Sequence, residues 1–144
     1  MDSLFDTEKD FQTTKDWTGF LKIYDSYFKY YKDKEINVLE IGVDKGKSLK
    51  LWRSYFTKAK ICGIDISQMN FKIEGVELIT ADQTNVKSLK KICEKYKSFD
   101  IIIDDGSHVS KHIITSFNFL FDYLAVGGLY AVEDLQTSYF PRYG

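Results

Sequence analysis

The chain has 144 residues, 44% of them hydrophobic, and 20 basic side chains nearly balance 21 acidic ones. This size predicts a single domain over residues 1–144, while the balanced charge and ordinary apolar content exclude a disordered chain and a nucleic-acid-binding protein. Two cysteines exclude a disulfide scaffold, no stretch reaches the about 20 apolar residues of a membrane span, and the polar start excludes a secretory signal, so we expect a cytoplasmic protein.

The first 36 residues predict a helical N-terminal segment. Residues 10–16 are polar and are expected to be loose. Apolar side chains then follow at the spacing of one face of an amphipathic helix. They are Trp17, Phe20, Leu21, Tyr24, Tyr27, Phe28 and Tyr31. We interpret this stripe as core packing rather than as a platform for nucleic acid.

Residues 37–144 predict a Rossmann-like core of alternating strands and helices. Short apolar runs indicate buried strands at residues 37–43, 60–66, 76–80, 99–104 and 129–132. Amphipathic helices are predicted at residues 47–56, 85–96 and 111–124, the last with Ile114, Phe117 and Phe121 facing inward and with Gly127 and Gly128 ending it. This alternation is typical of an α/β, doubly wound sheet of five mainly parallel strands in the order 3-2-1-4-5, with helices on both faces.

Acidic side chains follow each predicted strand, at the edge where the carboxyl ends of parallel strands meet and ligands bind. They are Glu40, Asp65, Asp82, Asp104 with Asp105, and Glu133 with Asp134. Carboxylates packed at one edge repel one another unless they have partners. The pattern therefore predicts a site that binds hydroxyl groups, an amine and a metal.

The loop after the first strand reads Glu40-x-Gly42-x-x-x-Gly46. It lacks the G-x-G-x-x-G spacing that brings a helix N-terminus onto a pyrophosphate. This disfavours a NAD-dependent oxidoreductase and suits a cofactor without phosphates. A turn glycine and a helix-entry glycine would explain the same pattern.

The next two strands also end in candidate ligand-binding residues. Asp65 is expected to accept ribose hydroxyls, with an N-cap as the alternative. Asp82 and Gln83 either face an adenine or cap the helix that follows. The residues alone do not decide between these two roles.

The run Asp104-Asp-Gly-Ser-His108 leaves the most hydrophobic strand. Successive strand residues point to opposite faces, so Asp104 and Asp105 are expected to serve different partners, while Asp105 and His108 can converge across the glycine turn. The alternative for His108 is a capping or surface position. His112 follows, and without a third ligand nearby we interpret it as a surface residue rather than a zinc ligand.

Glu133 and Asp134 end the neighbouring strand. Beside Asp105 they would form a group of carboxylates that needs a cation, and such an oxygen-rich group suits Mg²⁺. The alternative is that one acid caps a turn and the other is solvated.

Five segments carry a resemblance to a known family: VLEIGV at 38–43, GIDI at 63–66, DQ at 82–83, FDIIIDDGSH at 99–108 and GGLYAVEDLQTSY at 127–139. Together they resemble class I S-adenosylmethionine-dependent methyltransferases, and most of all the metal-dependent sugar O-methyltransferases of macrolide biosynthesis. Cephalosporin-hydroxylase-like proteins share much of the pattern.

The resemblance implies an S-adenosylmethionine- and Mg²⁺-dependent O-methyltransferase that acts on a sugar or another small hydroxylated acceptor. It implies that Asp105, Glu133 and Asp134 are Mg²⁺ ligands and that His108 is the general base. It assigns the cofactor pocket to Glu40, Gly42, Val43, Gly46, Ser48, Asp65, Ile66, Asp82, Gln83 and Asp104.

The family's domain continues past Tyr139 with a further helix and two more strands, so the chain is expected to be shortened at its C-terminus. The fifth strand would then be an open apolar edge, and such edges pair with other chains. We therefore expect a homo-oligomer through this edge. The alternative function is a shortened, non-catalytic or partner-dependent S-adenosylmethionine-binding module.

Overall fold

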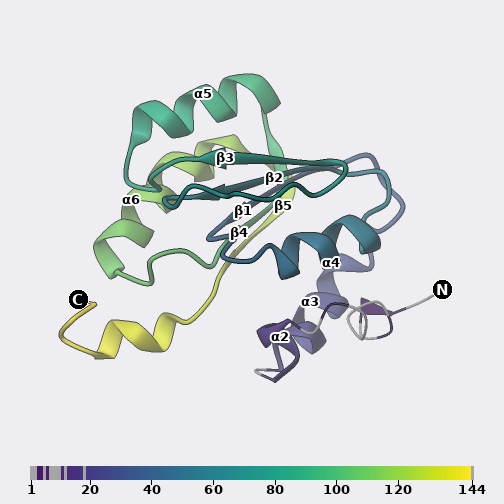
Figure 1. The fold of residues 1–144 in the computed structure, drawn as a ribbon, viewed down its shortest axis with the longest axis horizontal. Helices are drawn as coiled ribbons and strands as arrows, with labels where there is room; N and C mark the ends of the chain where they lie inside the picture. The colour runs from purple at the N-terminus through teal and green to yellow at the C-terminus, as the bar shows by residue number, and fades with distance from the viewer. Residues whose placement is uncertain (1–2, 5, 7–10, 12, 18, 144) are drawn as a thin grey trace.

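The computed structural model describes residues 3–4, 6, 11, 13–17 and 19–143, which form a sheet with helices on both faces (Figure 1). The strands in this part of the chain are β1 (Asn37–Ile41), β2 (Lys60–Asp65), β3 (Val76–Thr80), β4 (Phe99–Asp104) and β5 (Leu124–Val132). They are ordered β3-β2-β1-β4-β5, and every pairing is parallel. The predicted fold class and strand order are confirmed.

The helices form two layers, one on each face of the sheet (Figure 1). One layer contains α3 (Phe20–Phe28) and α4 (Lys47–Tyr55), and the other contains α5 (Val86–Tyr96) and α6 (Ser110–Leu120). Successive residues of β1 alternate between the two cores: Val38 packs with α3 and α4, and Leu39 with α5 and α6. The central strands are therefore buried on both faces. None of the described helices is long and apolar enough to cross a bilayer.

The N-terminal segment is two helices rather than one. α2 (Thr14–Trp17) is separated from α3 by Gly19, whose φ of +75° is left-handed and interrupts the helix. Most of the predicted stripe is buried, but Tyr27 is 55% exposed, because α3 buries a narrower face than expected. The predicted inward position of Trp17 concerns a side chain outside the described part of the structure.

Strand β5 is longer than predicted and contains the two glycines that were expected to end the preceding helix. Its register with β4 shifts within residues 125–128, which form a bulge. Gly127 has a φ of +78°, and a Cβ at Gly128 would lie 2.9 Å from the Asp100 carbonyl oxygen. The glycines therefore serve this edge bulge and end no helix.

Helix α6 ends at Leu120 and continues into the 3₁₀ turn η1 (Phe121–Tyr123). The prediction that Ile114, Phe117 and Phe121 face inward is wrong, because all three are exposed. Phe117 lies toward the edge strand, with its ring centroid 4.9 Å from that of Tyr130 in β5. In the described residues no strand lies beyond β5, so this side of α6 is uncovered.

Candidate functional site

The ends of β1, β4 and β5 bring Asp105 and Glu133 next to each other. The Asp105 N–H donates to the Ile41 carbonyl oxygen and the Glu133 N–H donates to the Asp104 carbonyl oxygen, both at 2.9 Å. These bonds extend the parallel ladders past the last strand residues, so the acidic residues stay in register. The carboxyl edge of the sheet is where ligands bind in folds of this class.

The two glycines of the first loop have backbone reasons to be glycine. Gly42 has a φ of +87°, and a Cβ there would lie 2.0 Å from the Asp105 carbonyl oxygen. Gly46 has a φ of +71° and is the N-cap of α4. These positions agree with the turn and helix-entry roles, and at Gly42 they also pack the loop closely against the one that follows β4.

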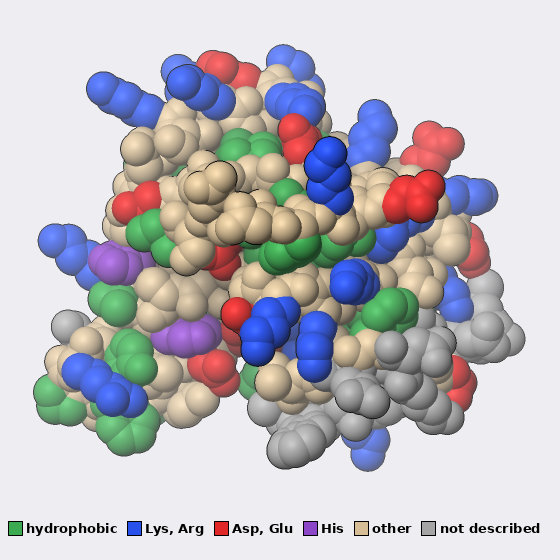
Figure 2. Space-filling view, viewed as in Figure 1, with side chains coloured by type: hydrophobic (Ala, Val, Ile, Leu, Met, Phe, Trp, Pro, Cys, Tyr) green, Lys and Arg blue, Asp and Glu red, His purple; other side chains and the backbone are tan. Residues whose placement is uncertain are grey.

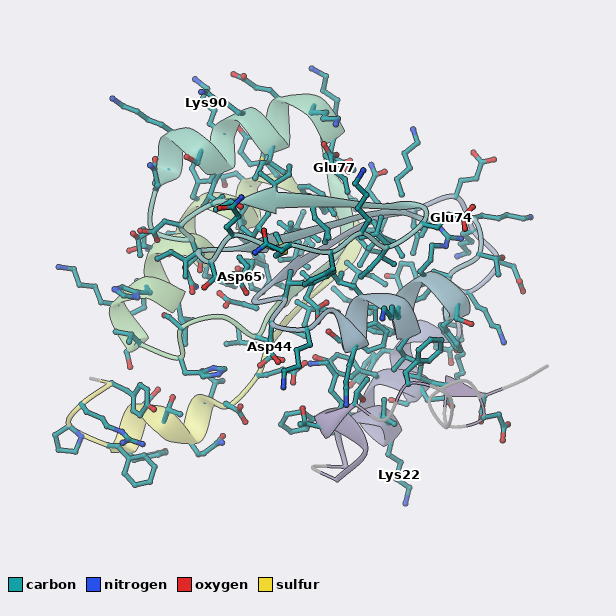
Figure 3. All side chains as sticks on the ribbon, viewed as in Figure 1. Lys22, Asp44, Asp65, Glu74, Glu77 and Lys90 are labelled. Atoms are coloured by element: carbon teal, nitrogen blue, oxygen red, sulfur yellow. The ribbon has the colours of Figure 1, made fainter. Side chains whose placement is uncertain are left out.

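Asp65 anchors the first loop from the end of β2 (Figure 3). Its Oδ2 accepts the N–H groups of Val43 at 2.8 Å and Asp44 at 3.1 Å, and its Oδ1 accepts that of Ser67 at 2.8 Å. Partial burial alone would raise the pKa of Asp65, but these backbone donors hold it below its ordinary value. A carboxylate has further acceptor positions, so Asp65 can still take a ligand hydroxyl.

Two cavities adjoin at this loop. The first, of about 400 Å³, is lined by residues that include Thr13, Lys15, Val43, Ser48, Asp105, His108 and Asp134. The second, of about 240 Å³, is lined by residues that include Ile66, Asp82, Gln83, Ser107 and His112. Gly42, Asp65 and Gly106 line both cavities, so an elongated ligand would pass from one to the other beside Asp65.

Seven of the ten predicted cofactor residues line one of these cavities, whereas Glu40, Gly46 and Asp104 line neither. Figure 2 shows both histidines, in purple, at the surface of this face with acidic side chains, in red, beside them. The cofactor contacts themselves remain a prediction.

Asp104 lies in a closed polar cluster behind the second cavity. Its carboxylate accepts the Ser116 hydroxyl at 2.8 Å and the Gln83 side-chain amide at 3.2 Å. The Gln83 carbonyl oxygen in turn accepts the Ser107 N–H at 2.9 Å. Burial raises the pKa of Asp104, and the Ser116 hydrogen bond opposes that rise. Asp104 thus fixes the loop that carries Asp105.

Two open points of the sequence are settled on this side of the sheet. Asn85 caps α5, with its side chain accepting the Ser88 N–H, so Asp82 and Gln83 do not cap that helix. His112 was predicted to be an ordinary surface residue, but it lines the second cavity, and its Nδ1 lies 2.9 Å from the Ser107 hydroxyl.

A separate cluster of Asp105, His108 and Asp134 faces the first cavity. One ligand atom from each lies within 4.8 Å of the others, a spacing at which they could hold a metal ion. His108 Nε2 is 4.0 Å from Asp105 Oδ1 and 3.8 Å from Asp134 Oδ2. His108 and Asp134 both have positive φ values, of 57° and 56°. Backbone of this kind in non-glycine residues concentrates at functional sites.

The turn after β5 supports this cluster. The 3₁₀ helix η2 (Leu135–Tyr139) begins directly after Asp134. The Thr137 hydroxyl lies 2.9 Å from the His108 carbonyl oxygen and 2.8 Å from that of Asp134. One side chain thereby joins the two loops that carry His108 and Asp134.

Lys15 is the residue that sequence reasoning missed. Residues 10–16 were expected to be loose, but Thr13 and Lys15 are buried. Lys15 Nζ donates to Glu133 Oε1 at 2.6 Å and to Asp105 Oδ2 at 2.8 Å. Burial alone would lower the pKa of Lys15, but the surrounding carboxylates raise it above its ordinary value. Since these partners lie 90 and 118 residues away in sequence, no local pattern indicates the contact.

Glu133 faces the N-terminal segment rather than His108. Its Oε1 accepts the Tyr24 hydroxyl at 2.6 Å in addition to Lys15. Burial raises the pKa of Glu133, and Lys15 opposes that rise. The structure therefore gathers Asp105 and Asp134 of the predicted metal ligands around His108, and the third, Glu133, pairs with Lys15.

Glu40 is the most buried acid beside the site. The Ser48 hydroxyl donates to its Oε2 at 3.0 Å, whereas Oε1 has no hydrogen-bond partner and lies 3.9 Å from Lys15 Nζ. Burial raises the pKa of Glu40 to about 7, although the Lys15 ammonium opposes the rise. An acceptor without a partner at this position suits a ligand amine.

Comparison with known proteins gives the family and the nearest functions. The family model of FtsJ-like methyltransferases matches residues 19–124. The chain is 40% identical over 133 residues to mycinamicin VI 2''-O-methyltransferase of Micromonospora griseorubida, covering 87% of this chain and 33% of that protein. It is 41% identical over 128 residues to 8-demethyl-8-alpha-L-rhamnosyl tetracenomycin-C 2'-O-methyltransferase of Streptomyces olivaceus, covering 83% and 34%. The chain thus spans about a third of the length of these relatives.

A solved structure shares the whole described fold. The MycE methyltransferase from the mycinamycin biosynthetic pathway, in complex with Mg, SAH and mycinamycin VI, superimposes with a TM-score of 0.92 at 36% sequence identity. The match covers 99% of this chain and 42% of that one.

Proposed function

The chain belongs to the FtsJ-like methyltransferase family, and from this premise we propose that it takes part in S-adenosylmethionine-dependent, Mg²⁺-dependent O-methylation of a sugar or another small hydroxylated acceptor. The observation that carries the proposal is the pair of adjoining cavities that meet at Asp65 and open onto Asp105, His108 and Asp134. The sugar is favoured because the tetracenomycin relative is named for a rhamnosyl substrate. The cephalosporin-hydroxylase-like relation remains a prediction.

The second cavity fits the adenosine part of S-adenosylmethionine. Asp65 is placed at its mouth to accept ribose hydroxyls, while Asp82 and Gln83 line its wall. The first cavity fits the methionine part, because the loop around Gly42 is packed closely enough to expose backbone groups and Glu40 Oε1 lacks a partner. The cofactor supplies an electrophilic methyl group, and these residues bind and orient it.

The residues around the first cavity also fit Mg²⁺. Asp105 and Asp134 offer the hard oxygen donors that Mg²⁺ prefers, and their ligand atoms already lie close together. When bound, Mg²⁺ orients an acceptor hydroxyl and makes it more acidic. Glu133 is the third ligand of our proposal.

His108 is the general base of the proposed reaction. Its Nε2 lies between Asp105 and Asp134 at the wall of the first cavity, where it can accept a proton from an acceptor hydroxyl. The Asp104 cluster and Thr137 hold the loops on which this atom depends.

A second candidate is a module that binds S-adenosylmethionine and needs a partner, or a second copy, for catalysis. The observation that favours it is the apolar side of β5 and α6, where Phe117, Phe121 and Val126 are exposed. Exposed apolar edges pair with other chains. Light scattering of the purified chain, combined with a turnover assay, separates an active monomer from this candidate.

The decisive test is calorimetric titration with S-adenosylhomocysteine, with and without Mg²⁺, on the wild type and on Asp65→Ala. We expect micromolar binding by the wild type, in the range common for substrates of enzymes at about 1 μM–1 mM. Asp65→Ala should bind more weakly, since it removes both a ribose acceptor and the anchor of the first loop. A folded wild-type chain that does not bind S-adenosylhomocysteine would refute the proposal.

A further inference from the structure

Lys15 reaches into the carboxylate cluster from outside the Rossmann-like core. It belongs to the short helix α2, and its side chain is 3% exposed. Its Nζ contacts two of the three carboxylates that we propose as Mg²⁺ ligands, Glu133 at 2.6 Å and Asp105 at 2.8 Å. A positive charge of the protein itself thus lies between two metal-ligand candidates.

The two oxygens of Asp105 have different partners. Oδ2 accepts from Lys15, whereas Oδ1 faces His108 Nε2 at 4.0 Å. On Glu133, Oε1 accepts from both Lys15 and Tyr24. A cation held by Asp105 and Asp134 can therefore bind beside Lys15, but one that also draws on the Lys15-bonded oxygens of Glu133 and Asp105 competes with the ammonium.

We propose that Lys15 is a built-in cation of this site, which holds Asp105 and Glu133 together until a divalent cation displaces it. This inference rests on the proposed function only in taking Mg²⁺ as the ion. It makes Lys15 a positioning residue: it offsets the repulsion of buried carboxylates in the metal-free protein and withdraws when the ion binds both acids.

The side chain suits this exchange. A lysine ammonium is a compact charge on a flexible four-carbon stem, without the fixed bidentate geometry of an arginine, so it can leave a carboxylate pair as one unit. Lys15 also lines the first cavity together with Thr13 and Thr14. Displacement of its ammonium would therefore change the wall of the cavity that receives the acceptor.

The test is a Mg²⁺ titration of the metal-free full chain, followed by calorimetry and by the melting temperature. Lys15→Met keeps the length of the side chain and removes its charge. We expect Mg²⁺ to bind this variant roughly tenfold more tightly than the wild type, because a competing like charge is gone. Without Mg²⁺ the variant should melt at a lower temperature than the wild type, and saturating Mg²⁺ should restore most of the loss.

Lys22→Met is the matched control. Lys22 is exposed on α3 and points away from the sheet (Figure 3), so its loss changes the net charge by the same amount without touching the cluster. Its Mg²⁺ affinity should equal that of the wild type. A second control, Tyr24→Phe, removes the other hydrogen bond to Glu133 without removing a charge, and it should not tighten Mg²⁺ binding.

Hydrogen exchange of the wild type tests displacement directly and needs no variant to fold. If Mg²⁺ displaces Lys15, the amides of residues 13–17 should exchange faster when Mg²⁺ is added. Exchange that slows or stays the same would overturn the inference. So would a Lys15→Met variant that melts lower but binds Mg²⁺ no more tightly, since Lys15 would then be a structural ion pair only.

Asp134→Asn separates this inference from the proposed function. Asp134 has a left-handed backbone, which asparagine tolerates, and none of its described contacts is with Lys15. Mg²⁺ binding that is lost in Asp134→Asn but unchanged in Lys15→Met keeps the metal site and overturns the exchange. Absence of Mg²⁺ binding by both the wild type and Lys15→Met overturns the metal site as well.

Discussion

Asp104 and Asp105 are adjacent in the chain, yet they belong to two regions of opposite character. Asp104 is 1% exposed, and protein donors at 2.8–3.3 Å fill its carboxylate. Asp105 borders the first cavity, and one of its oxygens meets only His108, at 4.0 Å. We call these the closed region, with Gln83 and Ser116, and the open region, with His108 and the acids after β5.

The difference shows that saturation by internal donors, rather than residue type, separates an architectural carboxylate from a chemical one. In the closed region every acceptor position near Asp104 is used to fix the loop that follows β4. In the open region the groups stand about a water or ion diameter apart, which leaves room for a ligand atom between them. The closed region supplies the rigidity that such a site requires.

The largest expected effect is the loss of turnover in His108→Ala. Removing a positioned general base typically costs about 10²–10⁴-fold in rate. Binding of S-adenosylhomocysteine should be unchanged, because the cavity predicted to hold adenosine does not include His108. The measurement is the rate of methyl transfer to a panel of sugar acceptors, paired with calorimetry.

His112→Ala is the control for that experiment. His112 lines the other cavity, so its loss should weaken cofactor binding rather than slow the chemical step. Turnover by His108→Ala at the wild-type rate would remove His108 from the mechanism and would take the chemistry out of the open region.

Matched substitutions at the two aspartates should break the comparison if it is wrong. Asp104→Asn places an amide donor among the Ser116 and Gln83 donors, which should lower the free energy of unfolding by about 2 kcal/mol, and leave Mg²⁺ affinity unchanged. Asp105→Asn should cost less stability but weaken Mg²⁺ binding by about tenfold or more, since a charged ligand is lost. Urea unfolding and Mg²⁺ calorimetry measure the two effects. Equal losses of Mg²⁺ affinity in both variants would show that the regions are not separate.

The two regions were not equally predictable from the sequence. Strand and helix alternation placed Asp105 and His108 at the right edge, because parallel strands must end together and successive strand residues point apart. The closed state of Asp104 depends on Ser116, one turn into the next helix layer, and no pattern in the strand announces it.

Long-range contacts account for the rest of what the sequence did not show. Lys15 is buried only because α3 packs onto α4 and brings α2 over the carboxyl edge, where Phe28 and Trp52 form an aromatic contact with centroids 5.5 Å apart. The bulge of β5 arises at the edge of the sheet, where Gly127 meets no neighbouring atoms. Both features depend on which elements become neighbours, and local periodicity does not encode that.

The smallest expected effect is a pH dependence that belongs to Glu40, at the rear of the open region. Burial raises the pKa of Glu40 from 4.5 to about 7, so between these values the folded state holds a proton that the unfolded state has released. The stability of the wild type should therefore fall as pH rises through this window, with Glu40 contributing on the order of 2 kcal/mol. Glu40→Gln keeps the Ser48 contact and removes the titration, so its stability should fall less steeply.

Urea unfolding of both proteins at pH 5 and pH 7.5 isolates this contribution. Glu133 and Asp104, whose pKa values burial also raises, contribute a slope of the same sign, but they are present in both proteins and cancel in the difference. Asp65 has a lowered pKa, so its contribution is lost only at pH values below its ordinary range, outside the window. Equal slopes for the wild type and Glu40→Gln would mean that Lys15 keeps Glu40 ionised throughout. The open region would then be fully charge-compensated before any ligand binds.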